Sequence, residues 1–186
     1  MTGRLTPRSA LGQLDTVVRR LKAFRGLSEA EVELIRGCGD RRERFAAGEE
    51  IVAEGEIAVR PRFILSGWAC RQRVLSDGRR QIFGFLLPGD SIGLRRRAGP
   101  ELASIAALTA LETADAEPVH EAAQSGRATG LVRALAAIEP TEQALLLDHV
   151  VRLGRQTAYE RVAHCLLELQ HRLEVVGLGD SQRFPL

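Results

Sequence analysis

The close spacing of chain-reversing residues in the middle of the sequence constrains the fold more than any other feature. In the segment LSDGRRQIFGFLLPGD (residues 75–90), a polar Asp77-Gly78 turn is followed about ten residues later by a Pro-Gly-Asp corner at residues 88–90. Asp77-Gly78 predicts a tight hairpin turn of a primed type, because both residues tolerate positive φ. The second corner interrupts the chain again, since Pro lacks a backbone donor and Gly has no side chain to pack. Two corners so close together predict short antiparallel strands wound into a sandwich or barrel.

Glycines divide the whole region from Arg41 to about Val119 into short runs. These glycines are Gly48, Gly55, Gly67, Gly78, Gly84, Gly89 and Gly93. Runs such as RFILSGWACRQRVL (residues 62–75), separated at this spacing, are typical of an all-β sandwich or barrel.

The region before Arg41 has the periodicity of helices. One apolar stripe at helical spacing consists of Leu14, Val17, Val18, Leu21 and Phe24. Ser28 and Glu31 then form a predicted capping box at the start of a second helix. Gly37 and Gly39 are expected to end that second helix.

From about Ala122 to Val176 the sequence is again predicted to be helical. Pro140 should start or kink a helix, and Gly154 is a plausible break. Leu146, Val150, Leu153 and Thr157 follow the four-three-four spacing of a coiled-coil seam. A second stripe is made by Ala158, Val162, Cys165, Leu166, Leu169 and Leu173. One stripe can pack on the β-core, and the other predicts a homodimer through a second copy of the same helix. The alternative is two helices packed within one monomer.

Composition excludes several classes of protein. The chain has 186 residues, 45% hydrophobic and 27% charged, with a net charge of only +2, which indicates a globular protein without a strong pull toward nucleic acid. It has no apolar run near the roughly 20 residues that span a bilayer and no leader-like segment, so we expect a cytoplasmic protein without membrane contact. Three widely spaced cysteines, Cys38, Cys70 and Cys165, are expected to be reduced, buried or inert thiols, with a redox sensor as the alternative.

Metal and enzyme chemistry are not expected. An enzyme on a cupin-like β-fold would need histidine and carboxylate ligands in the strands, and the segment from Arg41 to Val119 has no histidine. No cysteine pair or cysteine and histidine cluster has metal-ligand spacing. We therefore predict no catalytic residues, no metal and no cofactor.

Three segments in this order resemble the Crp–Fnr transcription regulators. They are GEEIVAEGE followed by RFILSGWA (residues 48–69), LSDGRRQIFGFLLPGDSIGL (residues 75–94) and LGRQTAYERVAHCLLELQHRLEVVGL (residues 153–178). The resemblance implies an α+β fold: a jelly-roll (double-stranded β-helix) sensor domain flanked by N-terminal helices and a long C-terminal dimerisation helix region. The expected parts are N-terminal helices in 1–40, a cyclic-nucleotide-binding-like jelly roll in 41–121, dimerisation and following helices in 122–176, and a linker in 177–186.

The resemblance also implies the partners. A regulator of this family forms a homodimer and contacts DNA through a C-terminal winged helix-turn-helix. The sequence ends at QRFPL, about where that domain would begin, so we expect a truncated or cleaved form and DNA contact only through the absent domain. The alternative is a stand-alone ligand-binding module of the cyclic-nucleotide type without DNA output.

The effector, if there is one, is not identified by the sequence. Cyclic-nucleotide binders of this fold carry a phosphate cassette, G-E-L followed by R-[ST]-A. In the corresponding stretch, GLRRRAGPELASIAALTALETA (residues 93–114), Glu101, Leu102 and Ala103 occupy the place of R-[ST]-A, so we do not expect a cyclic nucleotide to bind. The run Arg95, Arg96 and Arg97 is a candidate site for another anionic effector; its alternative is a solvated loop.

Overall fold

The computed structural model describes residues 10–94 and 99–179. Two helices and a short 3-10 turn open the chain: α1 (Ala10–Phe24), α2 (Glu29–Gly37) and η1 (Cys38–Asp40). The strands are β1 (Arg42–Phe45), β2 (Glu50–Val52), β3 (Arg62–Ser66), β4 (Ala69–Val74), β5 (Arg80–Leu86), β6 (Ser91–Ile92), β7 (Ser104–Ala107) and β8 (Leu111–Asp115). Helices α3 (Glu117–Gln124), α4 (Thr129–Arg155) and α5 (Ala158–Val175) follow.

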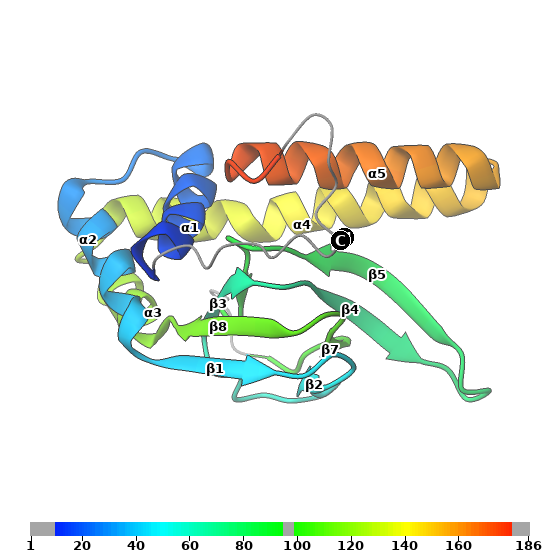
Figure 1. Ribbon diagram of the computed structural model, residues 1–186, viewed down its shortest axis with the longest axis horizontal. Helices are drawn as coiled ribbons and strands as arrows, with labels where there is room; N and C mark the ends of the chain where they lie inside the picture. The colour runs from blue at the N-terminus through cyan, green and yellow to red at the C-terminus, as the bar shows by residue number, and fades with distance from the viewer. Residues whose placement is uncertain (1–9, 95–98, 180–186) are drawn as a thin grey trace, which may run out of the picture.

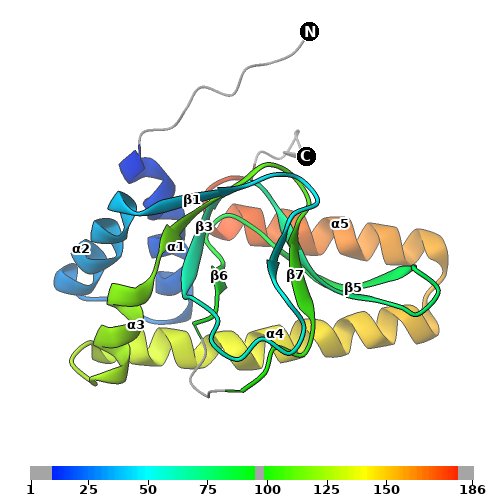
Figure 2. The same ribbon diagram turned by 90° about the horizontal axis from the view of Figure 1, so that it is seen from below.

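The strands form two antiparallel sheets, in the orders β1-β8-β3-β6 and β2-β7-β4-β5. In each sheet a strand from the beginning of the β-region pairs with one from its end: β1 with β8, and β2 with β7. This pairing is typical of a jelly roll, so the predicted jelly roll is confirmed (Figures 1 and 2). The core of the roll is made by Val52, Ile64, Ala69, Leu86, Ile92, Ile105, Ala107 and Leu111.

The hairpin between β4 and β5 turns where the sequence predicted it, but the turn type is different. The Gly78 amide donates to the Leu75 carbonyl (2.9 Å), and the Leu75 amide donates to the Arg79 carbonyl (2.7 Å). Gly78 has φ +81°, while no non-glycine residue in the described part of the chain has positive φ. The prediction of a primed turn was therefore wrong. Residues 75–78 form a type I turn, and its last residue, Gly78, has the left-handed conformation. The Asp77 carboxylate accepts from the Arg79 amide (3.0 Å), which suits Asp77 to this turn without positive φ.

The Pro-Gly-Asp corner takes the chain from β5 to β6, as predicted. Its Gly89 has φ +95°, and the Gly89 amide donates to the Ile64 carbonyl of β3 (2.9 Å). The Asp90 carboxylate closes the corner by accepting from the Leu87 amide (2.8 Å). A Cβ atom at Gly89 would lie 3.0 Å from the Thr16 carbonyl oxygen, so the corner is packed directly against α1.

The N-terminal helices follow the predicted pattern, and one residue joins them to the C-terminal half. The Ser28–Glu31 capping box is present, and α2 ends at Gly37. The Glu31 carboxylate also accepts from the Leu131 amide (3.0 Å), so it caps the beginning of α4. Burial acts to raise the pKa of Glu31, but the hydrogen bonds from Ser28 and Leu131 outweigh it, and the pKa is lowered. The carboxylate is therefore charged where it faces the positive end of α4.

The C-terminal helices differ from the prediction in where the first of them begins. Helix α3 begins at Glu117, earlier than the expected Ala122, because Pro118 in its first turn favours a helix start. Pro140 lies inside the continuous α4 and does not start a helix. Gly154 precedes the end of α4 at Arg155, so the expected break is found there. Helix α5 then runs back beside α4 on the same side of the roll (Figure 1).

Candidate functional site

Polar side chains connect the roll to α4 where strands β4 and β5 face this helix. Arg71 of β4 forms an ion pair with Glu142 of α4, with Nη1 and Oε1 2.9 Å apart and both side chains partly shielded from water. His149, two turns further along α4, lies close to the backbone of Ile82 in β5. Burial and the nearby Arg152 lower the pKa of His149, so this ring favours the neutral state. The two contacts couple the position of β4 and β5 to that of α4.

Further polar groups are buried in the sheet that carries β4. Gln72 and Ser104 are 8% and 6% exposed, and the Ser104 hydroxyl donates to the Gln72 carbonyl (3.2 Å). The Cys70 thiol lies 3.6 Å from the Gln72 side-chain oxygen, to which it donates. These polar groups therefore have hydrogen-bond partners within the sheet.

The place of the phosphate cassette is the loop between β6 and β7. Glu101 is only 5% exposed, and its backbone bonds in both directions with the loop after β2, through Gly55 and Glu56. Leu102 is 69% exposed, and its carbonyl accepts two hydrogen bonds from the Arg73 guanidinium (3.0 and 2.6 Å). The backbone of Glu101 is thus held in place, at the position where the sequence pattern leads us to expect the arginine of the cassette.

The candidate anion site is not tested by the structure. Arg95, Arg96 and Arg97 belong to the same loop between β6 and β7 but lie outside the described residues. Arg73, the guanidinium beside the cassette, already contacts the Leu102 carbonyl and the Glu54 carboxylate (2.8 Å).

We expect cyclic AMP and cyclic GMP to bind weakly or not at all. The loss of a charge-assisted pair costs about 1.5–3 kcal/mol, and repulsion by the Glu101 carboxylate adds to it. Isothermal titration calorimetry with each nucleotide measures this directly, and Glu101→Arg is the matched variant that should gain affinity if charge alone decides. A low-micromolar dissociation constant for the unmodified chain would show that Glu101 does not occupy the phosphate position.

The three thiols favour the protonated state. Burial raises the pKa of Cys38 to about 11, and it also raises the pKa values of Cys70 and Cys165. A thiol in this state is a poor nucleophile, which supports inert side chains over a redox sensor. In the residues that the structure describes, no group of three or more histidine, cysteine or acidic side chains is arranged to hold a metal ion.

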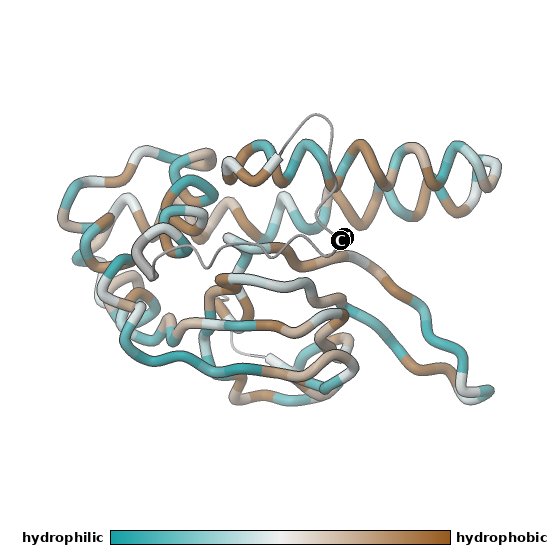
Figure 3. The backbone as a smooth tube through the Cα atoms, viewed as in Figure 1, coloured by the Kyte–Doolittle hydropathy of each residue, from teal (hydrophilic) through white to brown (hydrophobic). Residues whose placement is uncertain are grey.

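A second candidate site is the outward face of α4 in its C-terminal half. Of the predicted interface residues, Leu146, Val150 and Leu153 are 43%, 59% and 46% exposed. The same face carries Leu147 and Val151, which are also exposed and which the sequence analysis did not select. Leu147 and Val151 directly follow Leu146 and Val150 and have the same four-residue spacing, so the sequence already indicated that they lie on this face. Apolar positions recur along both α4 and α5 in Figure 3.

Several polar side chains of the same stretch of α4 are partly shielded from water, together with Leu145. Glu142 pairs with Arg71 of β4 and Arg152 with Glu168 of α5. His149 and Gln156, the C-cap of α4, are also partly shielded from water. A helix in a stable monomer normally places its apolar stripe inward and its polar residues outward. Here most of the large apolar side chains of this stretch are exposed, while these polar side chains are partly shielded.

Thr157 does not continue the predicted stripe. Helix α4 ends at Arg155, and Thr157 is the N-cap of α5, where its hydroxyl accepts from the Glu160 amide (3.4 Å). The heptad spacing placed Thr157 one step beyond Leu153 on a single helix, but the chain changes direction between these residues. An interface role for Thr157 therefore cannot rest on that spacing.

Comparisons with known proteins agree with this architecture. A family model described as cyclic nucleotide-binding domain matches residues 42–115. The nitrogen fixation regulation protein FixK of Bradyrhizobium diazoefficiens is 33% identical over 178 residues, which cover 92% of this chain and 72% of that protein. The chain belongs to the Crp–Fnr family of transcription regulators.

Solved structures of the Crp–Fnr family share the fold. FixK2 from Bradyrhizobium japonicum has a TM-score of 0.62 and 33% identity, over 71% of this chain and 66% of that one. The catabolite activator protein of Thermus thermophilus has a TM-score of 0.55 at 21% identity, over 86% of this chain and 81% of that one. This Crp–Fnr chain therefore provides a jelly-roll sensor domain followed by a long helix. No helix in the described part of the chain is long and apolar enough to cross a membrane.

Proposed function

We propose that this chain is the sensor and dimerisation part of a cytoplasmic transcription regulator that contacts DNA through a C-terminal winged helix-turn-helix. The observation that carries the proposal is the outward apolar face of α4, formed by Leu146, Leu147, Val150, Val151 and Leu153. A two-fold dimer would cover this face on both copies at once, since a self-complementary patch pairs with itself. The ion pair between Arg71 and Glu142 would then link each sensor domain to the dimer helix.

The signal that the sensor domain receives is proposed to be something other than a cyclic nucleotide. Glu101 is buried in the cassette loop and the Arg73 guanidinium is already engaged by Leu102 and Glu54, which supports this view. An anionic effector held by Arg95, Arg96 and Arg97 remains a hypothesis, and mass spectrometry of the purified protein for a copurified small molecule tests it.

The 186-residue chain is expected not to bind DNA specifically. Reading a sequence requires an element that enters the major groove, and a net charge of +2 provides little sequence-independent attraction. A longer form that carries a winged helix-turn-helix should bind a two-fold-symmetric site, with half-sites about 34–36 Å apart. Gel retardation in about 0.15 M salt compares the two forms. Specific retardation by the 186-residue chain would contradict this assignment of roles.

A further inference from the structure

The interior of the roll is apolar in the middle but charged at one end of strands β1, β3 and β8. Side chains two residues apart on a strand point to the same face of a sheet. Phe45, Ile64 and Leu111 pack in the apolar core of the roll, so the neighbouring inward positions follow from the strand register. These positions carry Glu43 on β1, Arg62 on β3, and Thr113 and Asp115 on β8. The inward face is therefore polar and charged where β1 follows η1 and β8 leads into α3.

A cavity of about 260 Å³ lies at this charged end, and we call it the end cavity. Its lining comes from η1, β1, β3, β8 and the segment before β3. Four arginines stand against three carboxylates in this lining, which leaves one positive charge in excess. None of the described residues that line the end cavity belongs to the loop between β6 and β7, so it is separate from the cassette. The mouth of a β-barrel is a common place for a ligand site, and this volume suits a small ligand.

The guanidinium groups of the end cavity are positioned by carboxylates, but two of them keep donors available. The Glu43 carboxylate holds two arginines, with Oε1 2.7 Å from Arg60 Nη1 and Oε2 2.8 Å from Arg62 Nε. Asp115 also faces two arginines, but its Oδ2 lies 3.5 Å from Arg60 Nη2 and 3.7 Å from Arg41 Nη1. Both distances exceed the length of an N–H···O hydrogen bond, about 2.7–3.2 Å. The donors of Arg41 and Arg60 are therefore free to bind an anionic group that enters between them.

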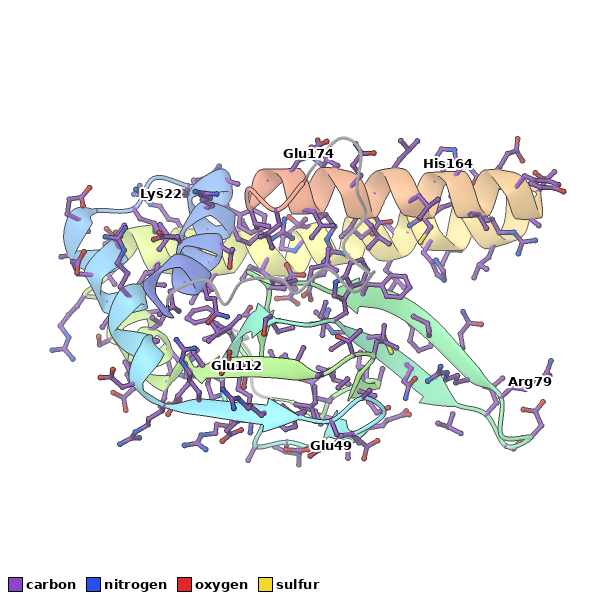
Figure 4. All side chains as sticks on the ribbon, in the orientation of Figure 1. Lys22, Glu49, Arg79, Glu112, His164 and Glu174 are labelled. Atoms are coloured by element: carbon purple, nitrogen blue, oxygen red, sulfur yellow. The ribbon has the colours of Figure 1, made fainter. Side chains whose placement is uncertain are left out.

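Thr113 adds a polar group that has no partner. The residue lines the end cavity and is only 1% exposed. In the part of the chain that the structure describes, its hydroxyl forms no hydrogen bond. The preceding residue Glu112, labelled in Figure 4, points to the other face of the sheet and pairs with Arg44 (3.2 Å). A buried hydroxyl is rarely left without a partner, so that of Thr113 indicates a ligand in the cavity.

We propose that the end cavity binds a small hydroxycarboxylate with one negative charge. Its carboxylate accepts hydrogen bonds from the guanidinium groups of Arg41 and Arg60 and balances the excess positive charge of the lining. Its hydroxyl groups donate to the Asp115 carboxylate and to the Thr113 hydroxyl. An anion without a donor, such as sulfate, leaves both of these acceptors unpaired. The site depends neither on a dimer nor on DNA contact, because all of these residues belong to one chain.

Isothermal titration calorimetry on the 186-residue chain tests the end cavity, with D-gluconate as the probe. Hexanoate is the matched ligand, since it has the same number of carbon atoms and the same charge but no hydroxyl group, and sulfate tests charge alone. The variant Thr113→Val removes only the unpaired hydroxyl, and Arg60→Met removes one guanidinium. Arg44→Met is the control, because Arg44 lies on the other face of β1 and its side chain is 84% exposed.

Gluconate should bind the unmodified chain and Arg44→Met about tenfold or more tightly than hexanoate or sulfate. Both Arg60→Met and Thr113→Val should weaken gluconate binding about tenfold. Thr113→Val should leave hexanoate binding and the urea midpoint unchanged, because its hydroxyl has no partner in the protein. Gluconate binding that is absent, no tighter than that of the matched anions, or unchanged in either variant would overturn the proposal. A lower urea midpoint for Thr113→Val would also overturn it, since the hydroxyl would then stabilise the fold rather than bind a ligand.

Discussion

The variant Val150→Asp is expected to convert a dimer of this chain into monomers. Val150 is 59% exposed at the middle of the outward apolar face of α4. In a two-fold dimer the substitution acts twice, and burying each valine contributes about 1.5–3 kcal/mol, so the dissociation constant should rise about 100-fold or more. An aspartate on this face would in addition have to lose its water without a partner.

Multi-angle light scattering at micromolar concentrations measures this result. The control is Ile57→Asp, which introduces the same charge at a 70% exposed apolar residue in the loop after β2. Ile57→Asp should leave the dimer intact. A monomeric unmodified chain, or a Val150→Asp chain that remains dimeric at the same concentration, would contradict the proposed interface.

The sequence predicted those parts of the fold that depend on local spacing. The stripe on α1, the Ser28–Glu31 capping box, the hairpin at Asp77-Gly78 and the corner before β6 are each decided by residues near one another in the chain. The hairpin type was missed because only the backbone shows that Asp77 avoids positive φ and instead accepts from the Arg79 amide.

Contacts between distant segments could not be predicted from spacing. The Glu31 carboxylate caps α4 at Leu131, a hundred positions along the chain, and nothing in its local pattern distinguishes this second role from the capping box. The ion pairs of Asp90 with Arg20 and Arg172 likewise join three separate parts of the sequence. The shielded polar residues of α4 could not be predicted for a related reason. They recur at helical spacing, but polar residues at that spacing are usually exposed, so the pattern does not show that they are shielded.

The variant Gly67→Ala is expected to lower the free energy of unfolding by about 2–4 kcal/mol, a large share of the 5–15 kcal/mol typical of a domain. Gly67 lies between β3 and β4 with φ +81°. A Cβ atom there would lie 2.1 Å from the carbonyl oxygen of Ala110 and 2.8 Å from Cα of Leu111. Both are backbone atoms, one in the residue before β8 and one in the first residue of β8, so no side-chain rotation relieves the clash.

The turn before β8 is also held to the residues after Gly67, which prevents it from moving away. The Trp68 amide donates to the Thr109 hydroxyl (3.0 Å), and the Leu108 amide donates to the Trp68 carbonyl (2.7 Å). Gly78→Ala is the matched control, because Gly78 has the same φ of +81° but no atom within 4 Å of a Cβ. Urea denaturation should show a loss of about 1 kcal/mol for Gly78→Ala, from the left-handed backbone alone. Equal losses in the two variants would mean that the close approach of the two turns contributes nothing, and that only the sign of φ requires glycine at this position.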